Sequence, residues 1–400
     1  MKHNLRLHKP LLTLLFLLSY FAAFTQINTL GQDAQISIIT IGPGKQLYDS
    51  FGHNAIRVAD PSNGKDLAFN YGTFDFNTPN FYIKFAQGKL PYALSVAPYD
   101  SFLKNYIAEK RSVKEQILDL TYGEKITLFE YLLNNAQPSN REYKYDFFFD
   151  NCATRIRDVL ALNLGSKLSY QKKQYAPDLF SFRELIQQRL HWNSWGSVGI
   201  DIALGAVIDR TAKAWEHQFL PDYVFESLNA ATITRNNTTT ALIKEQTTIN
   251  SATPWSRGTS FLLSPFFIFL MVAIGIVYTT LNDTKQQKRS RWLDAALFFV
   301  TGVVGVLLLL LWFATDHGAT STNYNILWAF PVNLIFCILV SKKSPKKWLG
   351  RYLSFLIILL ILMGVHWFTG VQVFAPALLP LLIAIGIRYI FIVRLLKKEP

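Results

Sequence analysis

The hydrophobic pattern divides the chain into two parts of different character. Up to about residue 260, short apolar runs alternate with polar and turn-forming residues, as in a water-exposed domain. Beyond that point the apolar runs lengthen, and most approach the roughly 20 residues that an α-helix needs to cross a bilayer. The pattern predicts an all-α transmembrane domain over residues 259–400 with about five helices. The apolar stretches are Phe261 to Leu281, Leu293 to Phe313, Tyr324 to Val340, Tyr352 to Phe368 and Val371 to Leu396.

The third of these stretches differs from the others. It is short, and it contains Pro331 and Asn333. A proline frees backbone hydrogen-bonding groups within a membrane helix, which neighbouring helices must then satisfy. We expect the third stretch to span the membrane only if the surrounding helices supply those partners.

The first 25 residues have the pattern of a secretory signal. Residues 1–10 carry three basic side chains, and Leu11 to Phe24 is almost purely apolar. The run ends at the small residues Ala22 and Ala23, as signal sequences do before a cleavage site. We expect residues 1–25 to act as a signal peptide, cleaved or retained as an N-terminal anchor.

Basic residues in the loops predict the orientation of the transmembrane domain. Short cytoplasmic loops are enriched in Lys and Arg. The segments after the first, third and fifth stretches are basic, whereas the loops after the second and fourth contain no Lys or Arg. The pattern predicts that the C-terminus is cytoplasmic and that residues 26–258 lie outside the inner membrane.

The formal net charge of +13 raises the question of a nucleic-acid partner. Residues 26–258 contain 24 Lys and Arg against 23 Asp and Glu, whereas residues 261–400 contain 13 against 4. The excess therefore belongs to the loops of the membrane domain, where it sets orientation. This distribution argues against nucleic acid as a partner.

The part before the membrane domain mixes strand and helix signals. Residues 36–42, 53–60 and 67–72 are short apolar runs separated by Gly, Pro and Asn, which is typical of strands. Helical patterns follow over residues 99–110, 121–136 and 152–164, and a strand is expected over 141–149. Thr121 with Glu124, and Ser181 with Glu184, have the spacing of helix capping boxes. We predict an α+β domain over residues 26–226, outside the membrane.

Residues 227–258 are rich in Thr, Asn and Ala. This composition resembles that of polar linkers. We expect this segment to tether the periplasmic domain to the first membrane helix.

Cys152 is the first candidate for chemistry. The other cysteine, Cys337, lies in the third apolar stretch, so Cys152 has no partner for an internal disulfide in the oxidising periplasm. Asp150 or Asn151 can cap a helix that begins at Cys152, and a helix N-terminus stabilises a thiolate. The alternative is that Cys152 is a small buried apolar residue.

A thiol nucleophile needs a base, and His53 is the best candidate. It follows the Gly52 turn and begins a predicted strand, whereas His191 and His217 lie among aromatic residues that favour packing. A third polar group usually orients the base. Asn70, on the neighbouring strand, is our candidate, although it also fits a turn before Gly72.

Several motifs resemble those of a known family. "TIGPGKQLYDSFGHNAIRVAD", "FNYGTFDF", "FDNCATRIRD" and "WGSVGIDIALG", with "TDHGATSTNYNILWAFP" in the apolar part, resemble the Lnb lipoprotein N-acyltransferases of Bacteroidota. The order of His, polar residue and Cys also resembles the permuted papain-like fold of lecithin:retinol acyltransferase and NlpC-type peptidases. The Lnb resemblance implies a cysteine acyltransferase, with Cys152 as nucleophile and His53 as base.

The same resemblance implies the two substrates. A membrane phospholipid would donate a fatty-acyl chain through a Cys152 thioester, and the α-amino group of a lipoprotein's N-terminal diacylglyceryl cysteine would accept it. We expect Tyr48 and Ser50, near His53, and Asp316 and His317, in an outward loop, to contact substrate. The alternative, which the sequence favours slightly, is that Asp316 and His317 belong to a solvated loop.

Other functions remain open at this point. The Cys and His pair also fits a thiol hydrolase, either a cell-wall peptidase or a phospholipase, and a buried Cys152 would fit a non-catalytic membrane assembly factor. The histidines and cysteines are too dispersed in sequence for a zinc motif, and no glycine-rich loop predicts a nucleotide. We therefore expect no metal and no cofactor.

Overall fold

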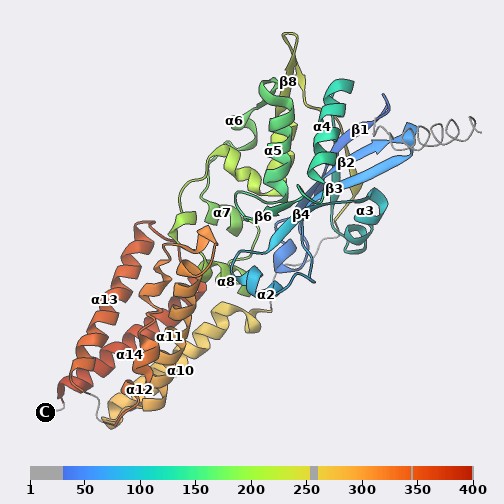
Figure 1. The fold of residues 1–400 in the computed structure, drawn as a ribbon. Coiled ribbons are helices and arrows are strands. Elements are labelled where there is room, and N and C mark those ends of the chain that lie inside the picture. Colours follow the sequence, from blue (N-terminus) through green and yellow to red (C-terminus); the bar gives the residue numbers. More distant parts are fainter. Residues whose placement is uncertain (1–29, 253–259, 344–345, 399–400) are drawn as a thin grey trace, which may run out of the picture.

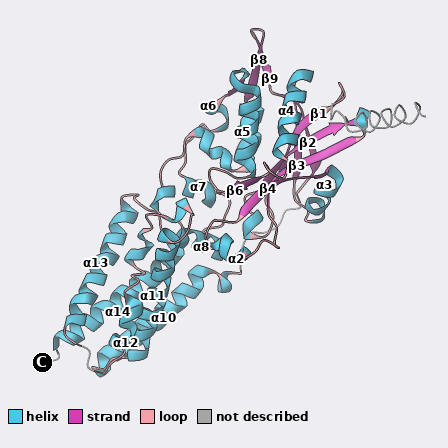
Figure 2. Cartoon of the chain, in the orientation of Figure 1, coloured by secondary structure: helices cyan, strands magenta, loops and turns pink. Residues whose placement is uncertain are grey.

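A computed structural model describes residues 30–252, 260–343 and 346–398, so the predicted signal segment lies outside the described residues. An N-terminal domain of strands and helices sits at one end of a bundle of long helices (Figure 1). Figure 2 shows that the strands are confined to the N-terminal domain. The predicted combination of an α+β domain and an all-α membrane domain is confirmed.

An antiparallel sheet of seven strands forms the centre of the N-terminal domain. Its strand order is β10-β5-β1-β2-β3-β4-β6, so strands from both ends of the domain meet in one sheet. The strands are β1 (Gln35–Ile41), β2 (His53–Asp60), β3 (Lys65–Thr73), β4 (Pro91–Pro98), β5 (Val113–Leu118), β6 (Glu142–Lys144) and β10 (Ile243–Asn250).

Helices cover the sheet on both faces. Alternate residues of a strand point to opposite faces. Ile36 and Ile38 of β1 accordingly pack in the core beneath α4 (Tyr122–Asn135) and α5 (Cys152–Leu164), whereas Ile39 and Ile41 pack on the other face beneath α3 (Tyr99–Ala108). This explains why β1 carries isoleucines on both faces and is buried along nearly its whole length. The helices of this domain are α2 (Phe81–Ala86), α3 (Tyr99–Ala108), α4 (Tyr122–Asn135), α5 (Cys152–Leu164), α6 (Lys172–Tyr175), α7 (Phe182–Gln187), α8 (Trp195–Ala203) and α9 (Pro221–Asn229).

Both predicted capping boxes form in the structure. The Thr121 side chain accepts a hydrogen bond from the Glu124 N–H at the start of α4, and Ser181 does the same for Glu184 at the start of α7. The strand expected over residues 141–149 is shorter than predicted. It ends at Lys144, because the Asp146 carboxylate accepts hydrogen bonds from the backbone of the next turn.

The prediction of a polar linker over residues 227–258 is wrong for its described part. Residues 231–250 form β8 (Ala231–Arg235), β9 (Thr238–Ala241) and β10, of which β10 extends the main sheet beside β5. The segment has the composition of a tether because β9 and β10 are edge strands whose residues are mostly exposed and therefore polar. Thr is nevertheless a strong strand former, and Ile233 and Leu242 anchor the segment in the main core.

Four helices of the described residues are long and apolar enough to cross a membrane. They are α10 (Pro265–Gln286), α11 (Arg291–Phe313), α13 (Trp348–Phe368) and α14 (Leu379–Lys398). The third predicted stretch is not one long helix, because it forms a short 3-10 turn and then α12 (Asn333–Val340), a helix of 8 residues.

Close packing explains how this broken segment exists at membrane depth. Irregular backbone is tolerated there only where protein covers it. Gly305 of α11 lies so close that an added Cβ would be 2.1 Å from the Ala329 carbonyl oxygen, and Asn333 donates to Thr301 across the same contact. Ala329 and Asn333 are fully buried.

The N-terminal domain is fixed on one end of the helical bundle. The Gly205 N–H donates to the Ala319 carbonyl over 2.9 Å, and Asn323 Nδ2 donates to the Ile202 carbonyl over 2.8 Å. A Cβ at Gly205 would lie 1.8 Å from the Ser321 carbonyl oxygen, so only glycine fits this contact. The catalytic candidates are therefore held at a set height above the membrane helices.

The structure leads to a test of orientation. The basic loops lie together at the far end of the bundle, where the Arg289 side chain donates to the Lys342 carbonyl. Alkaline phosphatase is active only after export to an oxidising compartment. Fused to a chain truncated after Gly318 it should be active, and fused after Pro400 it should be inactive at equal expression. Activity of the second fusion would contradict a cytoplasmic C-terminus.

Candidate active site

Three elements of the N-terminal domain bring the main candidates together. His53 begins β2, Asn70 lies in β3 and Cys152 begins α5, which packs against both strands. His53 Nε2 lies 2.6 Å from Asn70 Oδ1. Because the Asn70 oxygen accepts from Nε2–H, the other ring nitrogen is left for the Cys152 thiol, with which His53 also hydrogen-bonds. All three side chains remain partly exposed, so a substrate can reach them.

Asn151 fixes the start of the α5 helix. Its Oδ1 accepts hydrogen bonds from the Ala153 and Thr154 N–H groups at 2.8 and 2.9 Å, and its Nδ2 donates to the Phe147 and Phe219 carbonyls. Of the two predicted caps, Asn151 therefore takes the role, whereas Asp150 pairs with Arg155. An N-cap of this kind contributes about 1 kcal/mol to helix stability.

The charges of Cys152 and His53 stabilise one another. Burial by itself raises the pKa of the thiol, but the His53 imidazolium, through its charge and its hydrogen bond, and the Asn54 N–H bring the pKa of Cys152 below its usual value. Burial likewise lowers the pKa of His53, but the Cys152 thiolate and the Asn70 hydrogen bond raise it overall. The lowered pKa of Cys152 and the raised pKa of His53 both favour a thiolate and imidazolium pair, which is the reactive form of a cysteine nucleophile.

Aromatic side chains enclose this pair on two sides. The rings of Phe102 and Tyr106 lie 6.5 and 6.2 Å from that of His53. On the other side, Tyr145 is so close to Cys152 that burial and the thiolate charge raise the pKa of its phenol well above the usual value. Sequence reasoning missed these rings, because residues from α3 and from the turn after β6 meet His53 and Cys152 only in the folded chain.

Tyr143 and Gly72 form the wall next to the thiol. Gly72 has a φ of +91°, and a Cβ there would lie 3.7 Å from Cys152 Cβ and 4.0 Å from the Tyr143 hydroxyl. The Gly72 N–H lies near the oxygen of the buried Tyr143 hydroxyl, and among the described residues no acceptor takes the hydroxyl proton. Because Gly72 has no side chain, the space beside the Cys152 thiol stays open, and the Tyr143 hydroxyl borders it.

The four predicted substrate contacts lie outside this cluster. Tyr48 is 84 % exposed on the turn before β2, and the buried Ser50 hydroxyl donates to the Gln46 carbonyl over 2.8 Å. Asp316 pairs with Lys144 of β6 at 2.8 Å, and the His317 ring packs against Gly88. Asp316 and His317 thus hold the outward loop of the membrane domain against the N-terminal domain.

The other histidines follow the sequence-based interpretation. His217 is fully buried, and its two ring nitrogens contact the Lys213 carbonyl and the Phe180 N–H. His191 accepts a hydrogen bond from the Asn193 N–H through its Nδ1. Among the described residues, no three metal-ligating side chains form a cluster.

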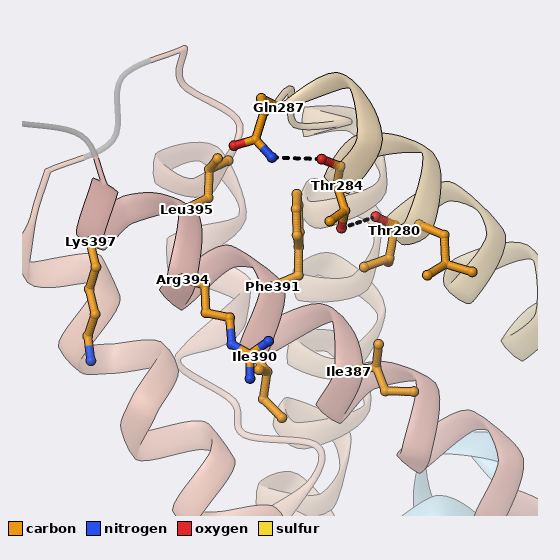
Figure 3. Close-up of a pocket in the computed structure, with 10 residues that line it drawn as sticks. Thr280, Thr284, Gln287, Ile387, Ile390, Phe391, Arg394, Leu395 and Lys397 are labelled. Carbon is orange, nitrogen blue, oxygen red and sulfur yellow. Dashed lines mark hydrogen bonds between the residues drawn. The ribbon is translucent and has the colours of Figure 1, made fainter.

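Two cavities differ in their relation to Cys152. One of about 380 Å³ lies beside Tyr143 and is also lined by Lys89, Glu142 and Asp316, so it opens between the candidate site and the membrane domain. Another of about 650 Å³ lies between α10 and α14 at the far end of the bundle (Figure 3). Its lining is half apolar and half polar, the polar residues being Thr280, Thr284, Gln287, Arg394 and Lys397. None of the candidate catalytic residues lines this cavity.

Comparisons with known proteins match two family models to this chain. The Lnb N-terminal periplasmic domain matches residues 20–188, and the Lnb transmembrane domain matches residues 257–399. The first includes His53, Asn70 and Cys152, and the second includes all four long helices. No curated protein and no solved structure matches the chain.

The lowered pKa of Cys152 can be tested by alkylation in a Cys337→Ala background. The midpoint of the alkylation rate against pH should lie below the usual thiol value of 9.0. His53→Ala should move it upward, because burial still opposes the thiolate while the imidazolium is lost. His191→Ala is the matched control and should leave the midpoint unchanged. An unchanged midpoint in His53→Ala would show that the two side chains do not interact.

Proposed function

The chain belongs to the Lnb family, and from that premise we propose that it is a lipoprotein N-acyltransferase that uses Cys152 as its nucleophile. The observation that carries the proposal is the contact of Cys152, His53 and Asn70 on a domain fixed to membrane-spanning helices. Both proposed substrates, a phospholipid and a lipoprotein with a diacylglyceryl cysteine, are held in a membrane. A site at the bilayer surface meets both at high effective concentration.

In the first half-reaction, the Cys152 thiolate attacks the carbonyl carbon of a phospholipid ester. The carbonyl oxygen takes up the negative charge of the tetrahedral intermediate. As the intermediate collapses, the bond from carbon to the alcohol oxygen breaks, and the His53 imidazolium donates its proton to that oxygen. The products are a fatty-acyl thioester on Cys152, a lysophospholipid and a neutral His53.

In the second half-reaction, the α-amino group of the lipoprotein attacks the thioester carbonyl. Neutral His53 accepts a proton from the amine as the carbon–nitrogen bond forms. The carbon–sulfur bond then breaks, which releases the N-acylated lipoprotein and restores the thiolate and imidazolium pair. Asn70 keeps the imidazole ring in one orientation through both halves, because its Oδ1 accepts from Nε2–H.

Two donors are available for the oxyanion of both intermediates. The N–H of Cys152 opens α5, where the first amides of a helix have no intrahelical acceptor. The Tyr143 hydroxyl lies next to Gly72, which also borders Cys152, and no acceptor among the described residues takes the hydroxyl proton. We assign these two groups to the oxyanion, because donors placed in advance are the usual source of such stabilisation.

The orientation of the chain in the membrane is the last part of the proposal. With the basic loops in the cytoplasm, the N-terminal domain lies in the periplasm, where lipoproteins carry their diacylglyceryl cysteine on the outer surface of the inner membrane. The Lys144 and Asp316 ion pair then lies at that surface, between the two domains. The loop that contains Asp316 therefore holds the catalytic domain in place, and the proposed mechanism requires no contact between this loop and the acyl group.

The proposal is tested in cells that lack other lipoprotein N-acyltransferases. Cys152→Ser and His53→Ala should each insert normally in the membrane and leave lipoproteins with a free α-amino group, as read by mass spectrometry of their N-terminal peptides. Cys337→Ser is the matched control and should retain activity. Full N-acylation by the Cys152→Ser variant would contradict the proposal. Release of free fatty acid without amide formation would indicate a phospholipase with the same dyad.

The role of Tyr143 predicts a specific kinetic effect. Tyr143→Phe removes only the hydroxyl, and loss of one oxyanion donor costs on the order of 100-fold in kcat. The Km for phospholipid should change little, because the donor acts on the intermediate. Tyr131→Phe, on α4, is the control and should have wild-type kinetics. A wild-type kcat for Tyr143→Phe would remove it from the mechanism.

A further inference from the structure

A group of exposed aromatic and aliphatic side chains surrounds α2, and we call it the α2 apolar surface. Two of its members, Phe76 and Tyr82, are 70 % and 80 % exposed. Soluble surfaces seldom leave so many large apolar side chains together, and such patches mark contacts with a partner or a membrane. The members are Phe74, Phe76, Tyr82, Ile83 and Phe85.

The position of α2 is fixed relative to the membrane helices. The Gln87 carbonyl, at the end of α2, accepts a hydrogen bond of 2.8 Å from the Asp316 N–H. Asp316 follows α11 by only a few residues, since α11 ends at Phe313. The α2 apolar surface therefore lies at the level where α11 leaves the bilayer, and Figure 1 shows α2 on the side of the N-terminal domain that faces the bundle.

A second contact marks the same boundary independently. Trp195 Nε1, at the start of α8, donates to the Leu263 carbonyl just before α10 begins. Trp192 packs edge-on against Phe266 in the first turn of that helix. Trp192, Trp195 and Leu263 are all exposed. Tryptophan and tyrosine are enriched where membrane helices meet the aqueous phase.

A chain of ring contacts joins the α2 apolar surface to the candidate active site. The Phe74 ring lies 5.3 Å from that of Tyr92, which stacks on Tyr145 at 4.3 Å. Tyr145 in turn lies beside Cys152. An apolar path thus leads from the level of the membrane surface to the thiol.

We propose that the α2 apolar surface enters the periplasmic leaflet of the membrane and delivers phospholipid acyl chains along Phe74, Tyr92 and Tyr145 to Cys152. This inference rests on the proposed function for the delivery step, whereas the membrane contact rests on the geometry of α2 alone. The exposed Lys89, next to the end of α2, adds a cation at the height of the lipid phosphates. The occupant is therefore the lipid leaflet rather than a second protein.

The membrane contact is tested with nitroxide labels in a Cys152→Ser, Cys337→Ala background. A label at Tyr82→Cys, in vesicles of phosphatidylethanolamine and phosphatidylglycerol, should collide more with oxygen than with a water-soluble nickel chelate. A label at Leu162→Cys, 66 % exposed near the end of α5, should show the opposite preference. Preference for the chelate at position 82 would overturn the proposal. Shielding that appears only after addition of a lipopeptide would identify the acceptor as the occupant and also overturn it.

The delivery step is tested with the triple variant Phe76→Ser, Tyr82→Ser, Phe85→Ser in an otherwise wild-type chain. Acylation of Cys152 by vesicle phospholipid should fall at least about tenfold more than acylation by a water-soluble short-chain ester, because effective concentration is lost only for the membrane donor. Leu162→Ser should affect neither. Equal losses with both donors would overturn the delivery route. If the wild-type protein accepts neither donor, the proposed function fails, while the nitroxide measurement still decides the membrane contact.

Discussion

The hydrogen-bonded pair of Cys152 and His53 is the interaction on which the function of this molecule depends. The two residues are about a hundred positions apart in sequence, and each stands at the first position of its element, β2 for His53 and α5 for Cys152. The first turn of a helix supplies free N–H groups. His53, as the first residue of the interior strand β2, lies where that strand ends. Asn70 on β3 then fixes the ring at 2.6 Å, so sheet register and helix capping together determine the chemistry.

The attachment of the N-terminal domain to the membrane helices is the second constraint on the site. Gly205 and Asn323 bond the backbone of one domain to the other, and Arg183 stabilises the contact from within. Its guanidinium is almost fully buried and pairs with Asp201 and Asp209 at 2.9 and 2.8 Å. A buried arginine left without its partners is costly, and Arg183 also donates to the Leu204 and Gly205 carbonyls, so the network orders the segment of the N-terminal domain that contacts the membrane domain. A fixed arrangement keeps Cys152 at one distance from the lipid surface.

Much of the secondary structure and the three main site residues could be predicted from the sequence, because they depend on local patterns of residues. Alternating apolar residues predicted β1, β2 and β3, and the capping boxes at Thr121 and Ser181 predicted the starts of α4 and α7. The apolar stretches predicted all four long helices. His53, Asn70 and Cys152 were selected by residue type and by their places at or near the ends of these elements.

The features of the fold and site that the sequence did not predict depend on contacts between segments that are distant in the chain. Tyr143 and Tyr145 approach Cys152 only because β6 pairs with β4 at the edge of the sheet. The Thr-rich segment of β10 is a strand because β5 offers it a free edge, which composition does not reveal. The third apolar stretch is broken because Gly302 and Gly305 let α11 cover its irregular backbone. The sequence of a segment does not show which partner will cover it.

The central claim is that Cys152 carries a fatty-acyl group between donor and acceptor. The most direct measurement is the intact mass of the protein after incubation with phospholipid in the absence of lipoprotein. The account predicts a mass increase of one fatty-acyl chain, located on Cys152, reversed by hydroxylamine and lost when a diacylglyceryl lipopeptide is added. An unmodified Cys152, in a protein that still N-acylates the lipopeptide, would contradict it.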